Sequence, residues 1–129
     1  MERQRLRTPL GQAIGLGSAK EGVDHWWAQR VSAVALIVLG LWFAIALVAH
    51  MGAARGDVAA WLHAPATAIL MILTLAAVFY HSALGLQVVI EDYVHSEWRK
   101  LALVVAMRLL SLALAVAGIF AVLRIAFGG

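Results

Sequence analysis

Three long apolar segments decide what this chain can fold into. They cover residues 31–49, 66–90 and 101–126. The first two carry no formal charge, and the third carries only Arg108 and Arg124. Each segment is close to or longer than the ~20 residues with which an α-helix crosses the ~30 Å core of a bilayer. Since the segments are apolar on every face, they do not suit a water-soluble bundle. The sequence predicts an all-α integral membrane protein with three transmembrane helices.

The composition agrees with a membrane protein and excludes several other classes. Hydrophobic residues make up 64% of the chain and charged residues 13%, whereas soluble domains are close to half apolar and a quarter charged. The chain has no cysteine, so disulfides and iron–sulfur clusters held by its own thiolates are excluded. The formal net charge is +3, and the basic residues adjoin the apolar segments. We therefore expect lipid headgroups, and no nucleic acid, as their partners.

The chain shows no domain boundary and no internal repeat, so we expect a single membrane domain over residues 1–129. A polar, glycine-rich stretch at 11–22 follows the N-terminal arginines, where a signal peptide would have an apolar run and a cleavage site. We expect residues 1–30 to form a retained cytoplasmic segment. Alanine recurs at every fourth position from Ala113 to Ala121, which fits either a close-packed helix face or the simple abundance of alanine.

The basic residues predict the orientation in the membrane. Most precede the first span or lie between the second and third: Arg3, Arg5, Arg7, Lys20, Arg30, Arg99 and Lys100. The loop between the first two spans has only Arg55. By the positive-inside rule the N-terminus and the loop between the second and third spans face the cytoplasm, and the C-terminus faces the opposite side of the membrane. Trp26, Trp27 and Trp98 would mark the inner interface and Trp61 the outer one.

His81 is the ionisable side chain deep inside the second segment. Such a residue costs free energy in a membrane and is a functional candidate by default. The helical rise places it about 14 Å from the inner end of the span at Ile90. A neutral imidazole there can ligate haem iron, relay protons or hydrogen-bond a neighbouring helix. Gly85, one turn further on the same face, leaves room for a flat porphyrin but does not decide between these roles.

This chain could not hold one haem with two of its own histidines. The other candidate, His50, lies at the outer end of the first span, roughly 30 Å from the inner interface. His81 lies roughly half as deep from that side. One iron atom cannot reach both side chains. A haem with two histidine ligands would therefore need a second chain, which predicts a hetero-oligomer.

A carboxylate and a phenol, Asp92 and Tyr93, stand at the inner end of the second span. Asp92 is eleven residues after His81, which at ~100° per residue returns it to nearly the same helix face. Quinone reduction needs a hydrogen-bond donor to a carbonyl oxygen and a route for protons. Tyr93 can donate, and Asp92 can orient it or pass protons. The alternative is an ordinary polar helix end at the membrane surface.

Other basic residues near the spans have two or more interpretations each. Arg30 satisfies the positive-inside rule, and it could also pair with haem propionates. His25 could join Arg30 or be an interfacial residue. Arg108 could snorkel, pair with a carboxylate of a neighbouring chain or contact a haem edge. Arg124 is near the outer end, where snorkelling explains it. Ser32 is the only hydroxyl of the first span.

The run 81–94 resembles the signature of the small hydrophobic membrane-anchor subunits of succinate dehydrogenase (complex II). That signature is a histidine, a glycine four residues later, and an Asp-Tyr pair eleven and twelve residues after the histidine, and all four elements are present. Residues 15–22 and 26–30 look like the entry segment of alphaproteobacterial members. The resemblance covers nearly the whole chain.

The resemblance implies a role for each of these positions. His81 would be an axial ligand of haem b, with the second ligand from a partner anchor subunit. Tyr93 would hydrogen-bond ubiquinone, with Asp92 beside it, and Arg30 and His25 would lie near the haem propionates. Electrons would arrive from a separate iron–sulfur subunit, itself bound to a flavoprotein subunit that oxidises succinate. The complex would link the tricarboxylic acid cycle to electron transport, and the chain would have no catalytic residue of its own.

Two alternatives to this function remain open from the sequence. One is the cytochrome b-type anchor of another membrane dehydrogenase, although such chains usually need several intramembrane histidines. The other is a haem-free structural anchor, which would need no chemistry at His81. A transporter fits poorly, because three spans without an internal repeat or broken helices offer little from which to build one.

Overall fold

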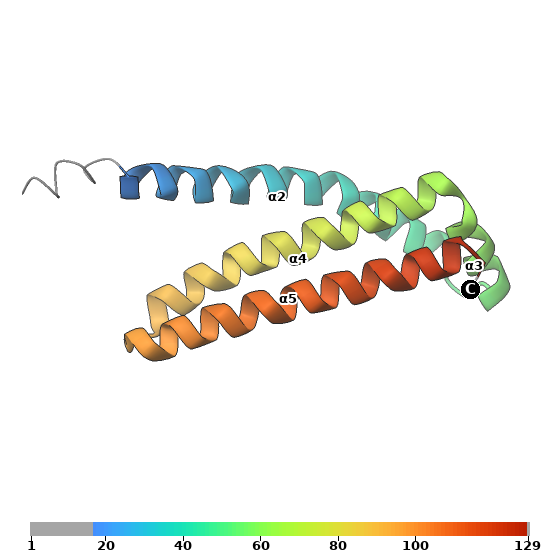
Figure 1. Cartoon of the computed structure of the whole chain (residues 1–129). Coiled ribbons are helices and arrows are strands. Elements are labelled where there is room, and N and C mark those ends of the chain that lie inside the picture. The colour runs from blue at the N-terminus through green and yellow to red at the C-terminus, as the bar shows by residue number, and fades with distance from the viewer. Residues whose placement is uncertain (1–16, 129) are drawn as a thin grey trace, which may run out of the picture.

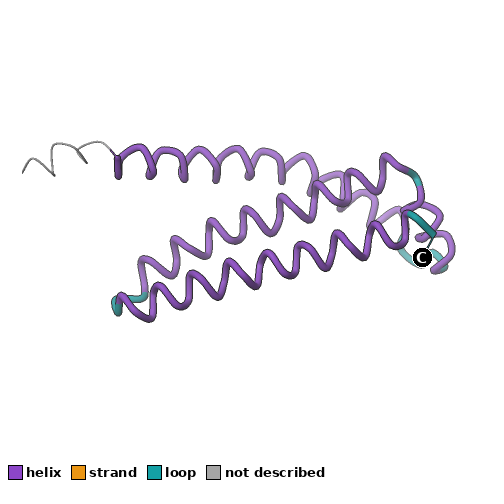
Figure 2. Tube along the Cα trace, in the orientation of Figure 1, coloured by secondary structure: helices purple, strands orange, loops and turns teal. Residues whose placement is uncertain are grey.

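The computed structural model describes residues 17–128 as four helices: α2 (Gly17–Ala49), α3 (Arg55–His63), α4 (Pro65–Tyr93) and α5 (Glu97–Ala126) (Figure 1). No strand occurs in this part of the chain, and the remaining residues are short turns and loops (Figure 2). The prediction of an all-α fold is confirmed. The N-terminal arginines and residues 1–16 of the expected cytoplasmic segment lie outside the described residues, as does the side chain of Lys20.

Three of the helices are long and apolar enough to cross a membrane, over Gly22–Ala49, Pro65–Tyr93 and Glu97–Ala126. Each continues into the polar residues at its ends, so the helices are longer than the apolar segments of the sequence. Pro65 occupies the first turn of α4, where its missing N–H costs no hydrogen bond. The prediction of three long apolar helices is confirmed, and their orientation stays a prediction.

The short helix α3 was not predicted and lies in the connection between the first two spans. Its first turn contains Asp57 and its last turn His63, which suits the helix dipole at both ends. The ring of His63 donates from Nδ1 to the carbonyl of Ala126, 3.1 Å away, at the C-terminus of α5. This hydrogen bond satisfies one of the carbonyls that a helix end leaves without a partner and joins α3 to α5.

The helix α4 lies between its two long neighbours. It packs against α2 along one side and against α5 along another, whereas α2 and α5 make no close backbone contact with each other. Figure 1 shows α4 and α5 side by side and antiparallel. Gly118 of α5 permits this approach, because a Cβ there would lie 3.3 Å from Leu75 of α4. The chain therefore has two helix seams, α2–α4 and α4–α5.

The core of this bundle is thin. Among the described residues, five hydrophobic ones are buried, namely Ala46, Leu62, Ala68, Leu84 and Val122, and the buried polar ones are Ser32, Thr67 and Thr74. Large apolar side chains on the outer faces are exposed, for example Ile37 at 70% and Leu109 at 63%. Apolar surface on this scale needs a cover of lipid or other protein.

The two ends of the bundle differ in their aromatic residues. Trp61 of α3 stacks on Trp42 with ring centroids 6.0 Å apart and lies 4.4 Å from the ring of His50. Trp26 and Trp27 stand near the opposite end, with centroids 5.2 Å apart. Tryptophans at both ends of the long helices fit the two interfaces of a bilayer.

Candidate functional site

His81 faces α2 across the α2–α4 seam. Its Nδ1 lies 2.9 Å from the hydroxyl oxygen of Ser32, a residue only 7% exposed. The same hydroxyl lies 3.1 Å from the carbonyl oxygen of Gln29, one turn earlier on α2. Within the described residues, the only buried side-chain nitrogen or oxygen without a hydrogen-bond partner is Nε2 of His25. Nε2 of His81 forms no hydrogen bond with a described residue. Since it is not among the buried atoms without a partner, it is open to the surface of the chain.

Gly85 lies one turn further along α4 and also faces α2. A Cβ at this position would lie 3.8 Å from Nε2 of Gln29. The flexible end of this glutamine is the only neighbour within 4 Å that such a Cβ would meet. That Gly85 makes room for a flat group beside the histidine stays a prediction.

A polar stripe runs along α2 on the side that meets α4. His25, Gln29 and Ser32 are spaced by four and three residues and so share one helix face. His25 is half-buried, and its Nε2 is shielded from solvent without a partner among the described residues. An orphaned polar nitrogen of this kind is rare in a completed site. It marks a place for a hydrogen-bonding group that the described residues do not supply.

Arg30 does not share this face. It is exposed, and its guanidinium lies 5.3 Å from the ring centroid of Trp26 in a cation–π contact. It lies two positions before Ser32, which is ~200° around the helix. The structure therefore brings Ser32 and His81 together at the seam. His25 shares the helix face of Ser32, and Arg30 lies on the outside of α2.

Asp92 and Tyr93 form the last residues of α4. Both are exposed, Tyr93 at 79%, and neither side chain forms a hydrogen bond with a described residue. Tyr93 lies twelve residues from His81, about 18 Å along the helix. Trp98, at the start of α5, is exposed at the same end. The phenol is thus presented at the end of the bundle, and any closed cavity around it needs walls from beyond the described residues.

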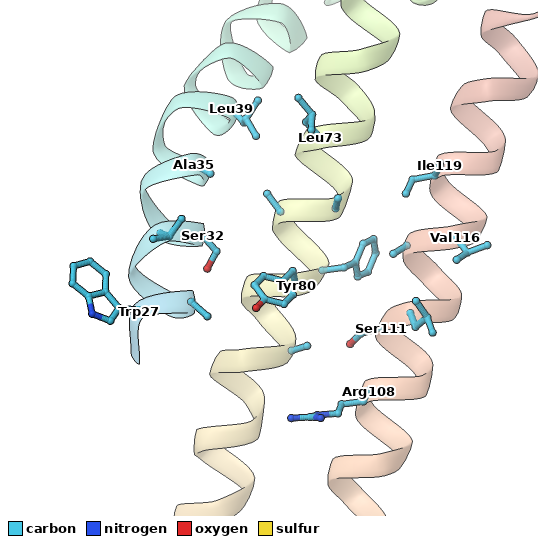
Figure 3. A pocket seen from close by; sticks show the side chains of 18 residues that line it. Trp27, Ser32, Ala35, Leu39, Leu73, Tyr80, Arg108, Ser111, Val116 and Ile119 are labelled. Atoms are coloured by element: carbon cyan, nitrogen blue, oxygen red, sulfur yellow. The ribbon is translucent and has the colours of Figure 1, made fainter. Parts of the chain in front are cut away.

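A groove of about 1040 Å³ opens between α2, α4 and α5, on the side where α2 and α5 stay apart. Its lining is almost wholly apolar, with Tyr80, Ser111 and Arg108 among the few polar side chains (Figure 3). His81 is not part of the lining. Sequence reasoning missed this groove, because it depends on the angle between helices.

Arg108 points from α5 toward α4 (Figure 3). It donates a hydrogen bond to Oε1 of Gln87, and Nε2 of Gln87 donates to Oε1 of Glu91, 2.7 Å away. The arginine is thus linked through an amide to a carboxylate near the end of α4. The partner of Arg108 in the structure is Gln87 of the same chain. This contact was not among the roles considered for Arg108 from the sequence. Arg124 is exposed in the last turn of α5.

The histidines do not form a metal site by themselves. No group of three or more His, Cys, Asp or Glu side chains that could hold a metal ion occurs in the described part of the chain. His50 donates from Nδ1 to the carbonyl of Ala46, 2.8 Å away. It lies in the turn after α2, eighteen residues beyond Ser32, about 27 Å from the level of His81. The two side chains cannot reach a common iron atom.

Together, the fold and the candidate site define a class: a small, multi-span membrane protein whose polar side chains are left partly without partners among the described residues. A family model described as the succinate dehydrogenase/fumarate reductase transmembrane subunit matches residues 4–121. The chain therefore belongs to this family, as one of the hydrophobic membrane-anchor subunits of succinate dehydrogenase.

Individual relatives agree with this family. The chain is 34% identical over 117 residues to the succinate dehydrogenase hydrophobic membrane anchor subunit of Rickettsia bellii, covering 91% of this chain and 94% of the relative. It is also 34% identical over 124 residues to the subunit of the same name from Paracoccus denitrificans, covering 96% and 95%. The succinate dehydrogenase membrane anchor subunit of Reclinomonas americana is 29% identical over 99 residues. No solved structure is a significant match.

Proposed function

We propose that this subunit holds one haem b together with a second membrane-anchor subunit and forms part of the ubiquinone site of a four-subunit succinate:ubiquinone oxidoreductase. The observation that carries the proposal is the geometry of His81. One ring nitrogen is held by Ser32, and the other is open to the surface. This is the arrangement that an axial histidine ligand needs.

The residues around His81 fit a haem. Gly85 leaves space one turn along the same helix. The unpartnered Nε2 of His25 suits an acceptor such as a propionate, and Arg30 suits a propionate that reaches the outer face of α2. Haem iron supplies one-electron transfer when it is bound. The chain offers one iron ligand, so the partner anchor subunit supplies the second.

Tyr93 and Asp92 are the residues of this chain that serve ubiquinone. The phenol donates a hydrogen bond to a quinone carbonyl oxygen, and the neighbouring carboxylate orients the phenol or passes protons from the cytoplasm. Their exposure at the end of α4 supports a site completed by the partner anchor and iron–sulfur subunits. Electrons reach it from the iron–sulfur subunit, which the flavoprotein subunit reduces.

The location that suits these roles is the bacterial inner membrane, with lipid around the three spans. The N-terminus and the loop after α4 face the cytoplasm, and the C-terminus faces the periplasm. This orientation puts Asp92 and Tyr93 on the side from which soluble subunits dock. It rests on the basic residues Arg99 and Lys100 beside that loop and on the positive-inside rule.

The difference spectrum of the purified complex, dithionite-reduced minus oxidised, tests the haem assignment. Wild type should show a b-type band, and His81→Ala should lose it. His63→Ala is the matched control, since it removes a histidine from the opposite end of the bundle, and it should keep the band. A band that survives His81→Ala would assign the haem to other chains. No band in any of the three would leave a haem-free anchor.

A further inference from the structure

We propose that Ser32 is a positioning residue that fixes the tautomer and the ring orientation of His81. The inference rests on the proposed function, because it concerns the same histidine and its use as an axial ligand. In this role Ser32 acts through Nδ1 of His81, 2.9 Å from its hydroxyl oxygen.

The direction of this hydrogen bond follows from counting protons. A serine hydroxyl has one proton to donate and two lone pairs. The carbonyl oxygen of Gln29, 3.1 Å away, can only accept. If Ser32 donates to Gln29, its oxygen must accept from His81, so the proton of the neutral imidazole is on Nδ1. The lone pair is then on Nε2, the nitrogen that is open to the surface.

The position of Ser32 makes this control effective. The residue is 7% exposed, so bulk water does not compete for Nδ1. It lies on α2 and His81 on α4, 49 positions apart in the sequence, so the bond also sets the rotation of the imidazole relative to the seam. Without the hydroxyl, the ring could turn or take the other tautomer, and Nε2 would no longer be held as an acceptor.

Metal-ligating histidines generally donate their second N–H to such a partner, which raises the basicity of the ligand. A hydroxyl that accepts from Nδ1 makes the imidazole a better electron donor and favours the oxidised iron. Removing it should therefore raise the midpoint potential of the haem. Loss of a partner of this kind typically lowers metal affinity by about 10–100-fold, so haem occupancy should also fall.

The experiment compares variants of Ser32 in the purified whole complex. Ser32→Ala removes the hydroxyl, and Ser32→Thr keeps it, because threonine can also bond a carbonyl three residues back. Thr74→Val is the matched control. Thr74 is another buried hydroxyl, 6% exposed, and it donates to the carbonyl of Leu70, 2.7 Å away. It has no side-chain partner among the described residues.

The readouts are the haem-to-protein ratio, the midpoint potential and the electron paramagnetic resonance signal of the oxidised haem. We expect Ser32→Ala to raise the potential and shift the signal, and Ser32→Thr and Thr74→Val to match wild type. A wild-type potential and signal in Ser32→Ala would overturn the inference. So would an equal shift in Thr74→Val, since the effect would then be one of general packing.

If Ser32→Ala does not assemble, Ser32→Cys decides, because a thiol of similar size is a weak acceptor. A raised potential in Ser32→Cys supports the inference, and a wild-type potential overturns it. The His81→Ala spectrum separates this failure from that of the proposed function. If His81→Ala loses the haem while the Ser32 variants are unchanged, only the positioning role is wrong. If His81→Ala keeps the haem, the proposed ligation is wrong.

Discussion

The polar residues of the candidate site fall into two groups that differ in exposure. Ser32 and His81 are buried and half-buried at the α2–α4 seam, with His25 half-buried on the same face of α2, whereas Asp92 and Tyr93 are exposed at the end of α4. A half-buried imidazole within an apolar span suits a redox group held away from water. An exposed phenol suits a site that closes only when another subunit docks on it.

The hydroxyl of Tyr93 can be tested by Tyr93→Phe, which keeps the ring and removes the donor. Loss of a hydrogen bond to a reacting quinone should lower the rate of ubiquinone reduction by roughly tenfold or more. Succinate oxidation with a soluble dye that takes electrons from the soluble subunits should not change. Tyr80→Phe is the control, because Tyr80 is the only other tyrosine. Equal ubiquinone turnover in Tyr93→Phe and wild type would remove Tyr93 from the site.

Individual positions of the site differ in how far the sequence could predict them. His81, Asp92 and Tyr93 stand out because their spacing within one helix is visible in the sequence. The contact of Ser32 with His81 depends on the register between two helices, which no local pattern fixes. Its one available signal was that Ser32 is the only hydroxyl of its span. The outward face of Arg30 could have been read from helical periodicity, two residues from Ser32.

At the scale of the helices, a hydrogen-bonded link joins α5 to the end of α4. It runs from Arg108 through the amide of Gln87 to the carboxylate of Glu91. A positive charge inside a span costs about 3 kcal/mol at the helix centre on insertion scales. The amide of Gln87 connects the guanidinium by hydrogen bonds to the carboxylate of Glu91, which lies nearer the membrane surface. The link therefore offsets part of the free-energy cost of placing an arginine at this position of α5.

The link predicts the outcome of a double-mutant cycle between Gln87 and Arg108. Gln87→Leu should destabilise the complex, since it leaves the guanidinium without its partner on α4. Arg108→Leu removes the charge as well, so the double variant should be no less stable than Arg108→Leu alone. We expect a coupling of about 1 kcal/mol, the range of polar contacts between membrane helices. Thermal unfolding of the purified complex measures it, and strictly additive effects would contradict the link.

The number of long helices could be predicted from the sequence, but their ends and the short helix α3 could not. Apolar runs long enough to span a bilayer identified the three long helices, because membrane insertion demands that length. The polar ends and α3 were missed, since they carry no apolar run. Ala113, Ala117 and Ala121 are exposed within this chain, whereas Gly118 makes the close approach to α4. The alanine repeat therefore does not pack α5 against its own neighbours.

At the scale of the whole molecule, the chain is a bundle with two seams and little interior. Among the described residues, the backbones of α2 and α5 make no close contact, and a groove of about 1040 Å³ remains between α2, α4 and α5. No side chain in the described residues is buried to below 2% exposure. Burial of apolar surface is the main stabilising contribution in water, and so little is buried within this bundle that it needs a cover of lipid or other protein. An anchor that other chains complete would have this form.

The orientation of the whole molecule can be tested directly, because the chain has no cysteine. Met51 and Phe127 are exposed, at 75% and 86%, at the end of the bundle that carries α3, and His95 is exposed at the other end. With a periplasmic C-terminus, Met51→Cys and Phe127→Cys should react with a membrane-impermeant maleimide in intact spheroplasts. His95→Cys should react only after the membranes are dissolved in denaturing detergent, which also exposes thiols that soluble subunits cover. The mass shift of this subunit on a gel reports the reaction. Labelling of His95→Cys alone in intact spheroplasts would reverse the orientation, and it would place Tyr93 on the side of the membrane that cytoplasmic subunits cannot reach.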